Sequence, residues 1–214
     1  MPREFSPLER KAHEWFSINK TVLFVIICLI TFAILFLKKR FIINEIPAFQ
    51  FMDTAQLAVF NIQAGIQYIT IPIVYAWKFS LIAFVLWTGC FLWGYRVTYA
   101  QCWKVVMIAE MIFFVPELIK IAWFLFVDNN PTYWDVRSFY PLSLMNFFDH
   151  EAVHGRYWYP NMALNLFEIA YWIVLTYGID FAARKKKSIA NAIVFTSYVP
   201  LFLIWLWFYI QVYK

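Results

Sequence analysis

The fold of this chain is decided by residues 104–127, which read KVVMIAEMIFFVPELIKIAWFLFV. The stretch is apolar and long enough to cross a bilayer, for which about 20 residues are needed. It also carries Glu110, Glu117 and Lys120, which lie on one face of a helix at about 100° per residue. Pro116 lies in the same turn and predicts a kink. The stretch therefore predicts a membrane-spanning helix with a polar face turned toward the interior of a bundle.

A second apolar segment, residues 161–181, carries a matching polar face made of Asn161, Asn165 and Glu168. An ionisable side chain at membrane depth costs a few kcal/mol unless it is paired or in contact with water. In antiparallel neighbours Lys120 and Glu168 lie at about the same depth, so we expect Lys120 to neutralise Glu117, Glu168 or both. The network either holds the helices in register, or forms a water-accessible site for a proton or substrate, or docks a partner helix.

The composition of the whole chain is that of a membrane protein. Hydrophobic residues make up 63% and charged residues 14%, whereas about a quarter of a soluble domain is charged. The mean hydropathy is +0.62. The net charge of +5 lies in short clusters beside apolar segments, which favours contacts with a lipid bilayer over nucleic-acid binding. The cysteines at 28, 90 and 102 lie in or next to apolar segments and are expected to be small buried side chains.

The sequence predicts an all-α, polytopic helix bundle with five spanning helices, at residues 21–37, 73–93, 103–127, 161–181 and 191–213. Residues 21–214 are expected to form a single transmembrane domain. Residues 1–20 form a polar arm that suits an amphipathic interfacial helix.

Residues 50–69 separate apolar from polar side chains on a helical wheel and predict another amphipathic helix, on the membrane or against the bundle. The alternative is a sixth, polar-faced crossing. Pro72 is expected to open the next span, in which Lys78 lies near one end and reaches the membrane surface. Gly89 and Gly94 are expected to allow close helix packing.

The basic cluster at residues 184–187, RKKK, predicts the orientation. The positive-inside rule places it in the cytoplasm, most simply at a bacterial cytoplasmic (inner) membrane. Five crossings then put the N-terminus in the cytoplasm and the aromatic loop 128–159 outside. In this scheme the basic residues 38–40 lie outside, against the rule, and a sixth crossing would remove that conflict.

Residues 150–154, HEAVH, have the spacing of a zinc-peptidase motif. On a helix, His150 and His154 would bind zinc with Glu151 as the general base, and Asp149 or Glu168 would be the third ligand. We expect a short helix over residues 141–154, ended by Gly155. Zinc-peptidase motifs lie inside long helices, and a Glu168 paired with Lys120 is not free to bind metal. A structural or adventitious metal site is another alternative. The favoured interpretation is an ordinary polar helix end without a cofactor.

Several pieces of the chain resemble bacterial members of the Yip1-like family of polytopic membrane proteins: FYPLSL at 139–144, YP at 159–160, NLFE at 165–168 and YW at 171–172. The similarity extends over residues 81–213. The eukaryotic Asp-Leu-Tyr-Gly-Pro motif of the family is absent, so a role in vesicle trafficking does not carry over. The resemblance implies a non-enzymatic membrane scaffold or accessory subunit of a larger inner-membrane complex.

Other membrane proteins are the expected partners of such a scaffold. The aromatic loop 128–159 and the helix at 50–69 are candidate contact surfaces, although Tyr and Trp also anchor proteins at the lipid interface. Two other functions are open. One is a membrane zinc metallopeptidase that uses His150, Glu151 and His154. The other is a small transporter with a polar site between the third and fourth spans.

Overall fold

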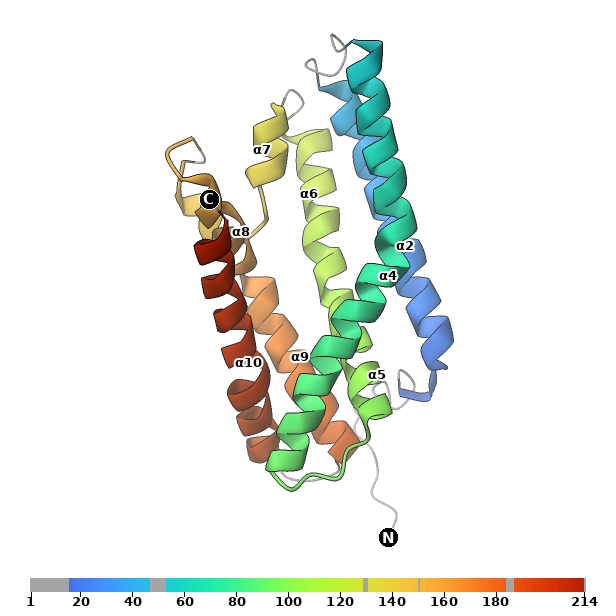
Figure 1. The fold of residues 1–214 in the computed structure, drawn as a ribbon, viewed down its shortest axis with the longest axis vertical. Coiled ribbons are helices and arrows are strands. Elements are labelled where there is room, and N and C mark those ends of the chain that lie inside the picture. The colour runs from blue at the N-terminus through green and yellow to red at the C-terminus, as the bar shows by residue number, and fades with distance from the viewer. Residues whose placement is uncertain (1–15, 47–52, 129–130, 150, 184–186, 214) are drawn as a thin grey trace.

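The computed structural model describes residues 16–46, 53–128, 131–149, 151–183 and 187–213. The regular structure within these ranges is helical, apart from one isolated β-bridge between Ser143 and Asn165. The long helices run along one axis and form an elongated bundle (Figure 1). Four of them are long and apolar enough to cross a membrane: Lys20–Glu45, Thr54–Leu92, Leu166–Ala183 and Ile189–Val212. The all-α prediction is confirmed, and the length and composition of these four helices suggest an integral membrane protein.

Helix α2, Lys20–Phe41, begins at Asn19, whose side chain accepts a hydrogen bond from the Thr21 amide at 3.0 Å. This is the usual N-cap arrangement. A short 3₁₀ turn, η1, follows at Ile43–Glu45. Of the predicted N-terminal arm, residues 1–15 lie outside the described ranges of the chain.

Helix α4, Thr54–Leu92, is continuous over 39 residues with Pro72 inside it. The prediction of a separate amphipathic helix at 50–69 and a new span from 73 is therefore wrong over the described residues. Contacts with α2 on both sides of Pro72 support the continuous helix. Thr31 and Tyr75 share a hydrogen bond of 2.9 Å, and the rings of Phe32 and Tyr68 lie 5.0 Å apart. Tertiary packing outweighs the one backbone hydrogen bond that proline removes.

The predicted span 103–127 consists of α5, Tyr99–Glu110, a 3₁₀ turn η2, Met111–Phe113, and α6, Phe114–Phe126. The three pieces continue in one direction along the bundle (Figure 1). The 3₁₀ turn lies next to Pro116, where the proline ring leaves the carbonyl of Ile112 without its helical partner. The helix is interrupted by a 3₁₀ turn at this place, and a kink of its axis stays a prediction.

The predicted span 161–181 is divided in two, into α8, Trp158–Ala163, and α9, Leu166–Ala183. The break has a local cause. The Asn165 side chain accepts a hydrogen bond from the Glu168 amide at 2.8 Å and so begins α9 as an N-cap does. The chain at 142–144 also pairs with 164–166, through Leu144 N to Leu164 O at 3.0 Å and Leu166 N to Leu142 O at 3.2 Å.

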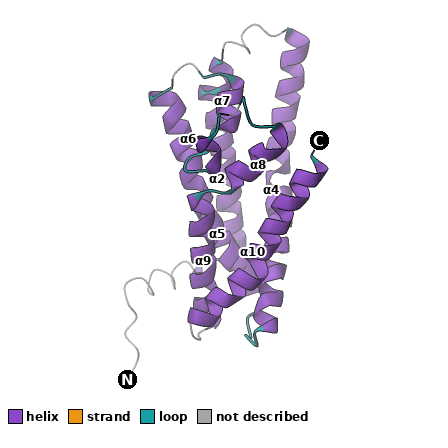
Figure 2. Ribbon diagram, turned by 90° about the vertical axis from the view of Figure 1, so that its left-hand side faces the viewer, coloured by secondary structure: helices purple, strands orange, loops and turns teal. Residues whose placement is uncertain are grey.

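The last helix, α10, runs over Lys187–Val212, close to the predicted span 191–213. The C-terminus, α8 and the short helix α7, Tyr133–Ser138, lie at one end of the bundle, which we call the upper end (Figures 1 and 2). The start of α2, the turn after α4, the end of α9 and the start of α10 lie at the opposite, lower end.

Close packing in the lower half depends on two glycines. A Cβ atom on Gly178 of α9 would lie 2.5 Å from Val105 Cγ1 of α5, and one on Gly89 of α4 would lie 2.8 Å from the Ser197 side chain of α10. The packing role predicted for Gly89 is confirmed. Gly94 instead adopts a positive φ of 71° with nothing within 4 Å of its Cβ position, so it serves the turn after α4.

Candidate functional site

A cavity with a volume of about 460 Å³ lies in the middle of the bundle, between α2, α4, α5, α6, α8, α9 and α10. We call it the central cavity. Most of its wall is apolar and aromatic, with a few hydroxyl and amide side chains. Five charged side chains also line it: Lys38, Lys78, Glu110, Glu117 and Glu168.

Two ion pairs lie in the wall of the cavity, and each joins two different helices. Lys78 of α4 contacts Glu110 of α5, with Nζ 2.6 Å from Oε1, and its ammonium lies 5.1 Å from the centre of the Phe113 ring. Lys38 of α2 is paired with Glu117 of α6. Glu110 is only 3% exposed, so the Lys78 contact is what makes its charge tolerable at this depth.

Sequence reasoning assigned neither partner. Lys78 was expected to reach the membrane surface, but it turns inward to Glu110. The sequence did contain a hint of this ion pair, because a lone lysine in an apolar span requires a charged or polar partner as much as a lone glutamate does. For Lys38, the hint in the sequence was that its predicted external position conflicts with the positive-inside rule. A lysine whose charge is neutralised by Glu117 removes that conflict.

Lys120 does not form the predicted ion pair. Its ammonium donates a hydrogen bond to the backbone carbonyl of Phe139 at 2.8 Å, and Lys120 is 8% exposed. The two ion pairs found among the described residues are Lys38–Glu117 and Lys78–Glu110. The carbonyl of Phe139 follows the end of α7, where it has no helical donor, so it competes successfully for the ammonium.

Glu168 is held by neutral donors. Its Oε1 accepts hydrogen bonds from Trp172 Nε1 at 2.8 Å and from the Tyr198 hydroxyl at 2.9 Å, and the residue is 6% exposed. Of the predicted network, the structure brings Glu110, Glu117, Asn165 and Glu168 to the central cavity. Lys120 and Asn161 do not belong to its lining.

Two buried polar atoms have no hydrogen-bond partner among the described residues, Glu110 Oε2 and the Tyr171 hydroxyl. The Tyr171 ring packs on Phe113 at 5.1 Å and on Tyr198 at 5.4 Å between ring centres, so both atoms belong to the same region beside the cavity. Unsatisfied buried polar atoms are rare in proteins and call for an explanation.

Tyr140 lines the cavity from the segment between α7 and η3. Burial, and then the negative charges of Glu117, Glu168 and Glu110, raise the pKa of its hydroxyl. The phenol therefore stays protonated at neutral pH, and its O–H remains a hydrogen-bond donor at the upper side of the cavity.

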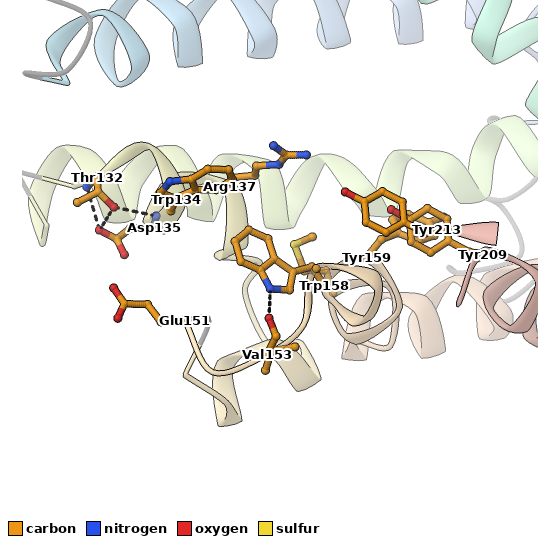
Figure 3. A pocket seen from close by; sticks show the side chains of 12 residues that line it. Thr132, Trp134, Asp135, Arg137, Glu151, Val153, Trp158, Tyr159, Tyr209 and Tyr213 are labelled. Atoms are coloured by element: carbon orange, nitrogen blue, oxygen red, sulfur yellow. Dashed lines mark hydrogen bonds between the residues drawn. The ribbon is translucent and has the colours of Figure 1, made fainter. Parts of the chain in front are cut away.

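A larger pocket, of about 780 Å³, opens at the upper end of the bundle (Figure 3). We call it the upper pocket. Its wall includes Trp134, Asp135 and Arg137 of α7, with Glu151 extending into the open space on the side of Asp135. Its other aromatic residues are Trp158, Tyr159, Tyr209 and Tyr213. Tyr159 and Met162 of α8 line both this pocket and the central cavity.

The HEAVH segment lies in this upper region. His150 is outside the described residues, while Glu151 and His154 are exposed and lie outside the helices. The predicted helix over 141–154 is wrong: the structure has a 3₁₀ turn, η3, at Leu144–Phe147. The Asp149 side chain then accepts a hydrogen bond from the Glu151 amide at 3.1 Å, which favours a turn over a helix.

His154 precedes another 3₁₀ turn, η4, Gly155–Tyr157, and its Nδ1 accepts a hydrogen bond from the Arg156 amide at 3.4 Å. Among the described residues no group of three His, Cys, Asp or Glu side chains is placed to hold a metal ion. The zinc motif also requires His150, so it stays a prediction.

Comparison of the chain with models of protein families, with curated proteins and with solved structures gave no match. The resemblance to the Yip1-like family therefore stays a prediction.

Proposed function

We propose that the chain is a non-enzymatic scaffold or accessory subunit of a larger inner-membrane complex, and that it binds another membrane protein through α4. The observation that carries the proposal is an exposed apolar stripe along this helix. Its members are 57–73% exposed, and they are Val59, Ile62, Ile66, Ile69 and Ile73.

The length of α4 argues that lipid does not cover the whole stripe. Its 39 residues span about 58 Å at about 1.5 Å per residue, and a hydrocarbon core is about 30 Å thick. Even at a tilt of about 40° the helix exceeds the core by about 15 Å. If the lower end of α4 lies at the lower membrane surface, Val59 and Ile62 lie beyond the hydrocarbon. Apolar side chains in that position need cover from a partner.

The spacing of the stripe suits an α-helix as that partner. The positions alternate in steps of three and four residues, as in the seam of a coiled coil, and the side chains are β-branched. Gly65 lies beside the stripe with nothing within 4 Å of its Cβ position, so a second backbone can approach closely. The proposed occupant is an apolar helix of another membrane protein.

The proposal includes five crossings, with α5, η2 and α6 together forming the third. The upper end is then external and the lower end cytoplasmic. Basic parts of the chain gather at the lower end, as the positive-inside rule requires of a cytoplasmic end. They are Lys20, Arg96 and the residues that flank the basic cluster 184–186. The ion pair between Lys38 and Glu117 accounts for a lysine near the other surface.

Site-specific photo-crosslinking in native membranes tests the docking surface. We expect crosslinkers at Ile62 and Ile66 to give one adduct, whose partner peptide is a transmembrane helix of a different protein. Crosslinkers at Gln63, on the polar side of α4, and at Ile173 of α9, 52% exposed, serve as matched controls and should give no such adduct. Exchanging both Ile62 and Ile69 for Gln should lower the Ile66 adduct about tenfold.

Equal crosslinking from Gln63 and Ile66, or lipid adducts alone, would remove the support for a docking stripe. An adduct with a second copy of the same chain would replace the proposed partner by self-association.

A second candidate function, a small transporter, is favoured by one observation, the charged central cavity inside the bundle. Its substrate would bind between α4, α6 and α9, with Glu110, Glu117 and Glu168 at the site. Lys120, which was expected to contribute, would act from outside the lining. Uptake into proteoliposomes is the corresponding test.

A further inference from the structure

We infer that the part of the central cavity beside Glu110 and Glu168 is a binding site for a small organic cation that carries an ammonium group, held by these two side chains. The inference deepens the second candidate function, because it names the ligand class of the same cavity. The docking role proposed for α4 does not depend on it.

The distribution of charge in the cavity favours a cation beside Glu110 and Glu168. Glu110 and Glu117 are seven residues apart, which is about 10 Å along the helix at about 1.5 Å per residue. Lys38 pairs with Glu117, and Lys120 is three residues further along α6, so both lysines offset negative charge near Glu117. The other two carboxylates of the lining, Glu110 and Glu168, have only Lys78 left as a lysine in the lining. Around them the lining therefore has one carboxylate more than it has lysines.

The hydrogen bonds that these carboxylates form also favour an ammonium group as the ligand. Glu110 uses Oε1 for Lys78, while its Oε2 is buried and has no partner among the described residues. The hydrogen bonds to Glu168 Oε1 come from an indole and a phenol, which are neutral. An ammonium group offers up to three N–H donors and one positive charge. It would satisfy Glu110 Oε2 and balance the charge of Glu168 at once.

The walls of the cavity suit the rest of such a ligand. Phe113, Tyr75 and Tyr140 contribute aromatic rings, whose faces attract cations within about 6 Å. Lys78 already lies 5.1 Å from the Phe113 ring centre, which shows that this ring face accepts an ammonium. The volume of about 460 Å³ lies in the range of small-molecule sites, about 300–1,000 Å³.

The upper pocket gives this cavity a route from the external side. Tyr159 and Met162 separate the two spaces and line both. The wall of the upper pocket carries Asp135 and Glu151 beside Arg137, and five of its side chains are aromatic (Figure 3). A cation would meet aromatic faces on this path and carboxylates at both of its ends.

Titration of the purified protein with defined probes tests the inference. Ethanolamine and tetramethylammonium are added in separate experiments, and sodium chloride at equal ionic strength is the reference. Binding is followed by calorimetry and by the melting temperature from tryptophan fluorescence. We expect saturable binding of ethanolamine and a higher melting temperature. We expect weaker binding of tetramethylammonium, which has no N–H donor for Glu110 Oε2.

The variant Glu168→Gln removes the charge but keeps an oxygen that can accept from Trp172 and Tyr198. It should fold and lose about a hundredfold in ethanolamine affinity, as expected for one charge lost at about 6 Å in a partly buried site. Glu45→Gln makes the same change at an exposed carboxylate outside the cavity and should bind as the unchanged protein does.

Stabilisation by sodium equal to that by ethanolamine, or affinity unchanged in Glu168→Gln, would overturn the inference, and the comparison with sodium needs no variant. Binding without uptake of labelled ethanolamine into proteoliposomes would support the site and count against the transporter function.

Discussion

Replacing Lys78 by Met should clearly lower the amount of folded protein. The change leaves the Glu110 carboxylate, 3% exposed, without its charged partner 2.6 Å away. The Lys78 side chain is itself 39% exposed, so the expected cost is that of one buried acceptor left without its donor, about 1–3 kcal/mol, which is a large fraction of the stability of many domains. The measurement is the monodisperse fraction in mild detergent and its melting temperature.

The double variant Lys78→Met with Glu110→Met should recover much of that loss, because an apolar pair of similar size is often tolerated where a lone charge is not. The cycle of the two single variants and the double variant isolates the pairing energy. Lys39→Met is a matched control. Lys39 donates to Asn61 at 2.9 Å at an exposed site, and its loss should change stability by less than about 0.5 kcal/mol. Equal losses in Lys39→Met and Lys78→Met would contradict a central role for the Lys78–Glu110 pair.

Replacing Gly178 by Leu should separate α9 from α5 and lower the free energy of unfolding by about 3 kcal/mol or more. Even the first added carbon would lie 2.5 Å from Val105 Cγ1 and 3.2 Å from Val105 Cβ, which belongs to the stem of the side chain and cannot move alone. The measurement is again the melting temperature of the purified protein in detergent.

Gly65→Leu is the matched control, because nothing lies within 4 Å of that Cβ position. It should leave the melting temperature unchanged or slightly higher, since glycine is unfavourable inside a helix. A fall as large as that of Gly178→Leu would show that the loss comes from leucine in a helix and not from the contact between α5 and α9.

The sequence identified most of the charged residues that line the cavity, but it assigned the wrong partners to them. Glu110, Glu117 and Glu168 are signalled by charge in apolar segments, which is visible in any single helix. Which lysine reaches which carboxylate depends on how separate helices pack against one another. Lys78 and Glu110 are brought together only by the contact between α4 and α5.

Helix boundaries were predicted well where they depend on neighbouring residues and poorly where they depend on distant ones. The interruption next to Pro116 follows from the local backbone. The break at Asn165 has a local signal as well, because the Asn165 side chain caps α9, but the accompanying pairing with residues 142–144 is not visible in the segment. Continuity through Pro72 depends on α2, so periodicity gave one helix too many there and one too few at Asn165.

The most direct test of the proposed arrangement is the side of the membrane reached by each end of the α5–α6 path. The three free cysteines are replaced, and single cysteines are placed at Arg96, before α5, and at Asn146, after α6, both exposed. Intact cells are then treated with a maleimide that does not cross membranes. Asn146→Cys should be labelled at once and Arg96→Cys only after permeabilisation. Labelling of both from the same side would contradict a crossing by α5 and α6, and with it the external position of the upper pocket.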